Sequence, residues 1–169
     1  MSNQQNGGLN STTLNSPNKH PQQAIDLLNG KLKPFLPQLE RSALTHGLRG
    51  EESGGFTTMV FDLAQQIDEM PRSYQTEGQG NRAMVYLHYF RGSIDAWITE
   101  LDSNPEQNYA FGKICMTGDE SDAEWGYISI PELTKNGVEL DLYWTPKPMF
   151  EVLSEIPDQA INNDQTLSI

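Results

Sequence analysis

The chain has 169 residues, which suffices for one domain of ordinary size, and its 23 acidic and 11 basic residues give a net charge of −12. This sign repels the phosphates of nucleic acids and the headgroups of anionic lipids. The single cysteine excludes an intramolecular disulfide, and no apolar run reaches the roughly 18 residues that a transmembrane helix needs. The composition predicts a soluble, cytoplasmic protein with no direct contact to nucleic acid or membrane.

The two ends of the chain differ from its centre in composition. Residues 1–23 are rich in Asn, Gln, Ser, Thr and Gly and contain no acidic residue. They bury too little apolar surface to offset the entropy of ordering, so a disordered tail is expected there. The polar residues 157–169 are expected to fray. A single domain is predicted between them, with a helical part at 24–80 and a sheet part at 81–156.

The helical part shows short amphipathic segments. Residues 24–30 and 37–47 each predict a brief helix that ends at a glycine. The clearest helical pattern begins near Thr57 and ends before Pro71, with apolar residues at the spacing of one buried face. A capping threonine is expected at the start of that helix.

Beyond residue 81 the apolar period changes from 3.6 to 2, which indicates β-strands. Five strands are predicted, at 83–91, 93–101, 109–116, 125–130 and 138–145. Short links favour antiparallel neighbours, so the sheet should be mainly a meander. A capping box from Ser129 to Glu132 predicts a short helix between the fourth and fifth strands, and 146–156 can form a last one. The expected fold is α+β, with N-terminal short helices packing on a mainly antiparallel five-stranded sheet.

Charge is divided unevenly along the chain. The first 50 residues carry five basic and two acidic side chains, so their net charge is +3 and that of the remaining residues is −15. Eight carboxylates, opposed only by Lys113, lie in the densest acidic stretch: Asp95, Glu100, Asp102, Glu106, Asp119, Glu120, Asp122 and Glu124. If the loops at 103–108 and 118–124 lie at one end of the sheet, these residues form an anionic surface that attracts a basic partner. The alternative is that they only keep the protein soluble.

A second candidate site is centred on His88. Strand alternation places Tyr86 and His88 on one face, and Asp95 or Glu100 on the adjoining strand could orient the imidazole for acid–base work. Together with Arg91 these residues would line the pocket of an enzyme. The alternative is that His88 is a hydrogen-bonded, half-buried strand residue. Since no nucleophile or metal partner recurs at a diagnostic spacing, no catalytic residue, metal ligand or cofactor is assigned.

Four segments between residue 86 and about residue 152 follow, in order and spacing, the motifs of an uncharacterised family. They are AWITELD (96–102), YAFGKICMTGDE (109–120), EWGYISIPEL (124–133) and VELDLYWTPKP (138–148). This region resembles the family called domain of unknown function twenty-nine fifty-eight. The resemblance implies a small protein of a plasmid, integrative element or phage, encoded near anti-restriction and DNA-processing functions, and it supplies no catalytic residues.

These observations favour a non-enzymatic, acidic accessory protein of a mobile genetic element. The expected partner is a host protein that processes nucleic acid, such as a restriction or CRISPR effector, which would be bound through its basic surface as by a DNA mimic. Two alternatives remain. One is a small enzyme with a site at His88, Glu100 and Arg91, and the other is a structural module that forms a homodimer through a sheet edge.

Overall fold

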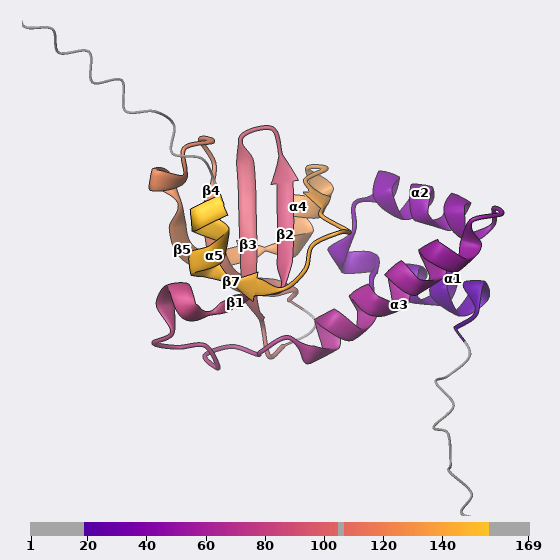
Figure 1. Cartoon of the computed structure of the whole chain (residues 1–169), viewed down its shortest axis with the longest axis horizontal. Helices are drawn as coiled ribbons and strands as arrows, with labels where there is room; N and C mark the ends of the chain where they lie inside the picture. The colour runs from indigo at the N-terminus through magenta and orange to yellow at the C-terminus, as the bar shows by residue number, and fades with distance from the viewer. Residues whose placement is uncertain (1–18, 105–106, 156–169) are drawn as a thin grey trace, which may run out of the picture.

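The computed structural model describes residues 19–104 and 107–155. The α-helices of this part are Pro21–Asn29 (α1), Gln38–Leu48 (α2), Ser53–Glu69 (α3), Ile130–Lys135 (α4) and Met149–Glu155 (α5) (Figure 1). Its strands are Met84–Val85 (β1), Leu87–Arg91 (β2), Ile94–Leu101 (β3), Tyr109–Cys115 (β4), Glu124–Ser129 (β5), Glu139–Leu140 (β6) and Lys147–Pro148 (β7). Short 3-10 helices lie at Lys33–Phe35 (η1), Gly80–Arg82 (η2) and Glu120–Asp122 (η3).

The predicted α+β fold is confirmed, with an antiparallel sheet in the order β5-β4-β3-β2-β6 and a small sheet of β1 and β7. Strands β2 to β5 form the expected meander. Strand β6 returns to the free edge of β2, where Leu140 pairs with Tyr89. The predicted strand 138–145 is paired only at its start, because the chain turns at Asp141, whose carboxylate accepts the N–H of Tyr143 at 3.0 Å.

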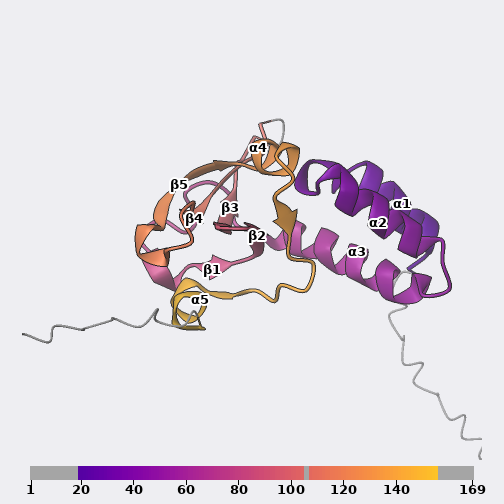
Figure 2. The same ribbon diagram turned by 90° about the horizontal axis from the view of Figure 1, so that it is seen from above.

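Helices α1, α2 and α3 form a bundle on the side of the sheet where β6 and α4 lie (Figures 1 and 2). The bundle and the sheet share one hydrophobic core, and hydrogen bonds also join the helical part of the chain to the sheet. The buried Tyr89 hydroxyl donates to the Phe35 carbonyl at 2.8 Å, and the Leu140 N–H donates to the Glu40 carboxylate at 3.2 Å. The sheet is thereby fixed against the helical part of the chain.

Two predicted boundaries in the helical part are corrected by the structure. Helix α1 begins at Pro21, with His20 closing a capping box, so the expected tail over residues 1–23 extends too far. Residues 1–18 and the predicted frayed end at 157–169 lie outside the described residues. Helix α3 begins at Ser53, and Thr57 lies inside it with its hydroxyl donating to the Ser53 carbonyl, so the predicted threonine cap is wrong. One of the two hydrogen bonds of the predicted capping box is confirmed, since the Ser129 hydroxyl accepts the Glu132 N–H at 3.3 Å.

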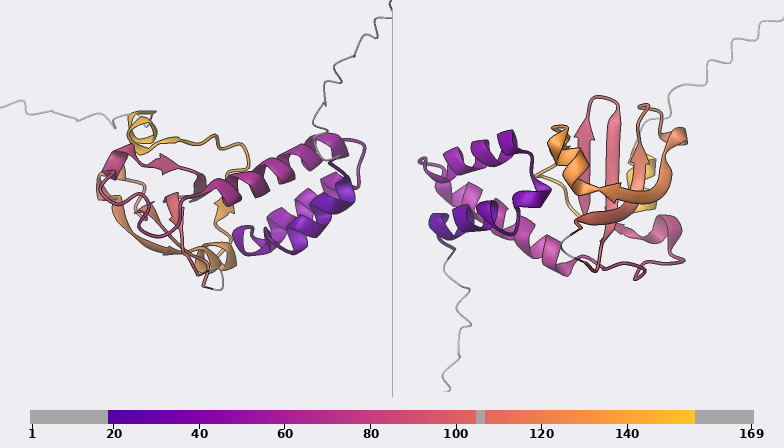
Figure 3. Two further views of the ribbon diagram at one scale, coloured as in Figure 1. Left: turned by 90° about the horizontal axis from the view of Figure 1, so that it is seen from below. Right: turned by 180° about the vertical axis from the view of Figure 1, so that it is seen from behind.

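The two faces of the sheet are covered by different elements, since α4 and α5 lie on opposite sides of it (Figures 2 and 3). One face joins the main core through residues such as Leu87, Tyr89 and Ile98. The other face is covered by α5, whose Met149 and Val152 pack with Val85, Trp97 and Cys115. We call it the α5 face. It also carries His88 and Trp125, because these residues share cross-strand rows with Trp97.

Candidate functional site

The acidic loops that were expected to form one surface lie at opposite ends of the sheet. Strand β4 connects them, and it pairs Ala110 with Leu101 at one end and Cys115 with Asp95 at the other. Asp102 therefore lies at the end remote from Asp95, and its carboxylate accepts the N–H of Asn104 at 2.7 Å. Glu106 lies outside the described residues. The prediction of one continuous surface is therefore wrong.

Glu100 is not part of any exposed surface, since it is only 4 % exposed. Strict alternation would place it on the face of Ala96 and Ile98. A register shift between Ile98 and Glu100 turns it instead to the α5 face, opposite Phe111. There its carboxylate accepts the backbone N–H of Tyr74 at 2.9 Å and both the N–H and the hydroxyl of Thr76.

Five of the eight carboxylates share the end of the sheet that holds the β2–β3 and β4–β5 turns. We call this group the acidic end: Asp95, Asp119, Glu120, Asp122 and Glu124. The turn is held by its own hydrogen bonds. Ser121 donates its N–H and hydroxyl to Asp119 at 3.0 and 2.6 Å, and these bonds lower the pKa of the Asp119 carboxyl. The Thr117 hydroxyl donates to Asp122 at 3.0 Å.

The carboxylates of the acidic end repel one another. Partial burial and then the negative charges of Asp95 and Asp119 raise the pKa of Glu120 above its ordinary value. Among the described residues, no Lys or Arg forms an ion pair with any member of the group. Asp95 is bound by His88. The acidic end therefore presents negative charge that the described part of the chain leaves largely uncompensated.

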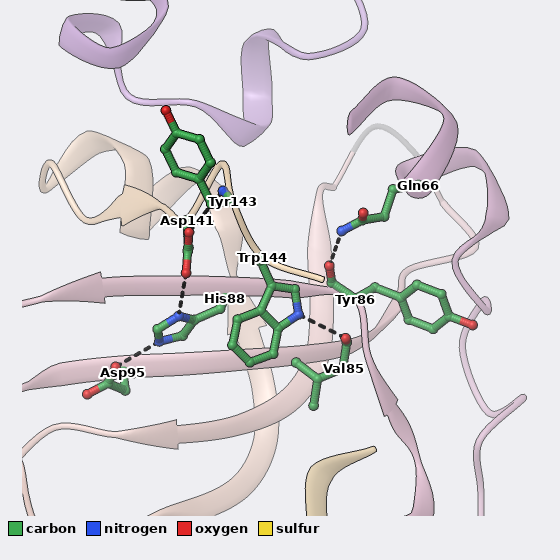
Figure 4. Close-up of polar contacts among 8 residues, drawn as sticks. All are labelled: Gln66, Val85, Tyr86, His88, Asp95, Asp141, Tyr143 and Trp144. Atoms are coloured by element: carbon green, nitrogen blue, oxygen red, sulfur yellow. Dashed lines mark hydrogen bonds and ion pairs between the residues drawn. The ribbon is translucent and has the colours of Figure 1, made fainter. Parts of the chain in front are cut away.

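His88 lies between two aspartates, as Figure 4 shows. Its Nε2 lies 2.8 Å from Asp95 Oδ1, and its Nδ1 lies 3.6 Å from Asp141 Oδ2, an ion-pair distance too long for a hydrogen bond. The ring stacks on Trp97 with centroids 5.9 Å apart and lies 5.0 Å from the Trp144 ring. These contacts tie the segment after β6 to the sheet. They agree with the alternative prediction for His88, which is that of a hydrogen-bonded, half-buried strand residue.

The predicted enzyme pocket is not assembled by the fold. Arg91 lies on the face opposite to His88, where its guanidinium donates to the Asn136 carbonyl. Tyr86 falls in the break between β1 and β2, and its carbonyl accepts the Gln66 amide (Figure 4). Glu100 is held by the chain at Tyr74 and Thr76. Among the described residues, Glu100 and Arg91 line different pockets.

A pocket of about 490 Å³ that the sequence did not reveal lies on the α5 face beside Glu100. Phe111, Trp125 and Tyr127 line it from β4 and β5, and Tyr74 lines it from the chain before β1. The sequence signal was the alternation of Trp125 and Tyr127 opposite Phe111, which typically indicates core packing. The register shift that carries Glu100 beneath these rings has no such signal.

The described residues show neither a metal cluster nor a membrane span. No three His, Cys, Asp or Glu side chains of that part converge so that they could hold a metal ion. Each helix found there is too short or too polar to cross a bilayer.

Comparisons with known proteins add no relative. No family model matches the chain, and neither a curated protein nor a solved structure matches it. The resemblance noted for residues 86–152 therefore rests on its four sequence segments alone.

Proposed function

We propose that this protein is a non-enzymatic binding protein whose acidic end holds a basic surface of a partner protein. The observation that carries the proposal is the group of carboxylates at that end, for which the described chain supplies no Lys or Arg partner. Like charges gathered at one place cost folding stability, and a cationic partner relieves that cost. The pKa of Glu120 is raised first by burial, and the negative charges of Asp95 and Asp119 add to the rise, as this repulsion predicts.

Two features favour a specific contact over general solubility. Asp119 and Asp122 are held by hydrogen bonds within the β4–β5 turn, so little side-chain entropy remains to be lost on binding. The net charge of −12 also steers a basic partner toward the protein before contact, which raises the association rate.

The partner class follows from charge and from the resemblance of residues 86–152. A protein that processes nucleic acid carries a basic surface for phosphates, and an acidic surface complements it. The resemblance adds the context of a mobile genetic element encoded near anti-restriction functions. The proposed role is thus that of a mobile-element accessory protein that occupies the nucleic-acid surface of a host restriction or CRISPR effector.

The test reverses charge at the acidic end without breaking its turn. The carboxylates of Glu120 and Glu124 accept no hydrogen bond from the described residues, and the backbone bonds of both residues survive a side-chain change, so Glu120→Lys with Glu124→Lys should leave the turn intact. We expect this double variant to recover the partner about tenfold less efficiently from a host lysate, because attraction becomes repulsion. The measurement is affinity capture at low and high salt, with the captured protein identified by mass spectrometry.

The control changes the same amount of charge elsewhere. Glu51 and Glu52 are exposed and lie just before α3, remote in the fold from the acidic end. Glu51→Lys with Glu52→Lys should recover the partner as the wild type does. Equal recovery by both double variants would show that the acidic end is not the binding surface.

A further inference from the structure

The pocket beside Glu100 is walled by aromatic rings. The rings of Phe111 and Trp125 are stacked with centroids 5.7 Å apart, and Phe111 meets Tyr127 edge-on at 5.6 Å. The hydroxyl of Tyr127 donates to that of Tyr74 at 3.3 Å, which joins the two sides of the pocket. Tyr74 and Tyr127 are 71 % and 66 % exposed, so this side of the pocket faces solvent.

A buried negative charge lines the same pocket. Glu100 is 4 % exposed, and it accepts three hydrogen bonds from Tyr74 and Thr76, all of which suit a carboxylate. No Lys, Arg or His of the described chain comes within ion-pair distance of it. A buried carboxylate is costly unless an opposite charge lies beside it. A positive group of a ligand would supply that charge to Glu100. The pKa of Tyr127 is raised, first by its hydrogen bond with Tyr74 and also by the charges of Glu100 and Asp102.

The backbone holds this arrangement under strain. Tyr74 has a φ of 69°, a left-handed conformation that is unfavourable for a residue with a bulky side chain. The strained residue directs its N–H to Glu100 while its ring stays at the mouth of the pocket. Strain of this kind is concentrated at functional and ligand sites.

We propose that this pocket binds an organic cation, namely an ammonium group that carries apolar substituents. Aromatic faces attract cations, and the Glu100 carboxylate supplies the opposite charge. An anion would be repelled by Glu100 and by Glu77, which also lines the pocket. A volume of about 490 Å³ lies within the range of small-ligand sites.

This site is independent of the proposed partner surface. Glu100 lies near the end of β3 that pairs with the start of β4, whereas Asp95 lies at the other end of the same strand. The double variant Glu120→Lys with Glu124→Lys is therefore expected to bind the cation as the wild type does.

Calorimetric titration of the full chain with choline tests the proposal. The control ligand is 3,3-dimethylbutan-1-ol, which has the shape of choline without its charge. We expect choline to bind at least about tenfold more tightly than the alcohol, as a partly desolvated cation–π contact predicts. Equal affinity for the two, or no heat with choline up to ~10 mM, would overturn the proposal.

Capped trimethyllysine, titrated in parallel, separates the two sources of such a cation. Tighter binding of trimethyllysine than of choline supports a modified side chain of another protein as the ligand. Tighter binding of choline supports a free small molecule. Either result supports the proposal that the pocket binds a substituted ammonium group.

Variants locate the binding. Glu100→Gln keeps the shape of the side chain and removes its charge, and it should reduce the preference for choline over the alcohol to what the aromatic rings alone supply. Tyr127→Leu removes one wall and should weaken choline binding about tenfold, whereas Tyr143→Leu alters another exposed tyrosine that lies outside the pocket and should leave choline binding unchanged. If Glu100→Gln fails to fold, the comparison of Tyr127→Leu with Tyr143→Leu alone tests whether the cation binds in this pocket. Equal affinities of the two tyrosine variants would show that the cation binds elsewhere.

Discussion

Gly112→Ala is expected to lower the free energy of unfolding by about 3 kcal/mol or to prevent folding altogether. Gly112 lies in β4, between β3 and β5, at the point where the pairing with β3 shifts register. A β-carbon there would lie 2.0 Å from the Trp97 carbonyl oxygen and 3.0 Å from the Ile98 α-carbon. Both are backbone atoms of a central strand, so neither can move without opening the sheet.

Its cross-strand partner is the matched control. Gly126 pairs with Gly112 in the ladder of β4 and β5, and a β-carbon on Gly126 would meet nothing within 4 Å. Gly126→Ala should therefore change stability by no more than about 1 kcal/mol, since a strand alanine restricts the unfolded chain. Urea denaturation of both variants provides the comparison. Similar losses in the two would contradict the close approach of β3 to Gly112.

Stability is expected to fall by about 2 kcal/mol between pH 4.5 and pH 7 because of one carboxyl group. Burial raises the pKa of Glu40 from 4.5 to about 7. The hydrogen bond from the Leu140 N–H lowers this pKa, whereas the negative charges of Glu139 and Asp141 raise it further. The folded protein therefore binds a proton that the unfolded chain releases. The stabilising contribution is complete below pH 4.5 and is lost as the pH rises through about 7. Solvent screening of the partly exposed group makes the loss smaller than the full shift implies.

Glu40→Gln isolates this effect from other titrating groups. Glutamine keeps an oxygen for the Leu140 N–H and carries no charge at any pH. In denaturation at pH 5 and pH 8, the variant and the wild type should be similarly stable at the lower pH, and the variant should be the more stable at the higher one. A stability difference that does not change with pH would contradict the assignment to Glu40.

The sequence predicted most of the secondary structure because local patterns determine it. Strands β3, β4 and β5 follow their alternation of apolar residues, and α4 follows the capping box at Ser129. The start of α3 was missed because its first turn contains Gly54 and Gly55, which favour a loop locally. The pairing of β6 with β2 was not predicted, since register between distant segments depends on the shape of the whole core.

The candidate sites were harder to predict because they depend on one irregular residue and on topology. Alternation alone could not show that Glu100 is turned to the α5 face beneath Phe111, since this follows from a local shift in pairing. Nor could composition show at which end of the sheet each acidic loop lies. Once hairpin links are assumed, however, successive turns of a meander alternate between ends, so Asp102 and Asp119 could have been separated from the sequence.

The dependence of partner affinity on salt decides whether the acidic end binds through its charge. With the captured partner purified, its dissociation constant is measured across a range of salt concentrations for the wild type and for the Glu120→Lys, Glu124→Lys variant. We expect the wild-type affinity to fall steeply as salt increases and the variant to show a weaker affinity with a distinctly shallower slope, because fewer opposed charges remain to be screened. The same affinity and the same slope for both proteins would contradict an electrostatic interface at this end of the sheet.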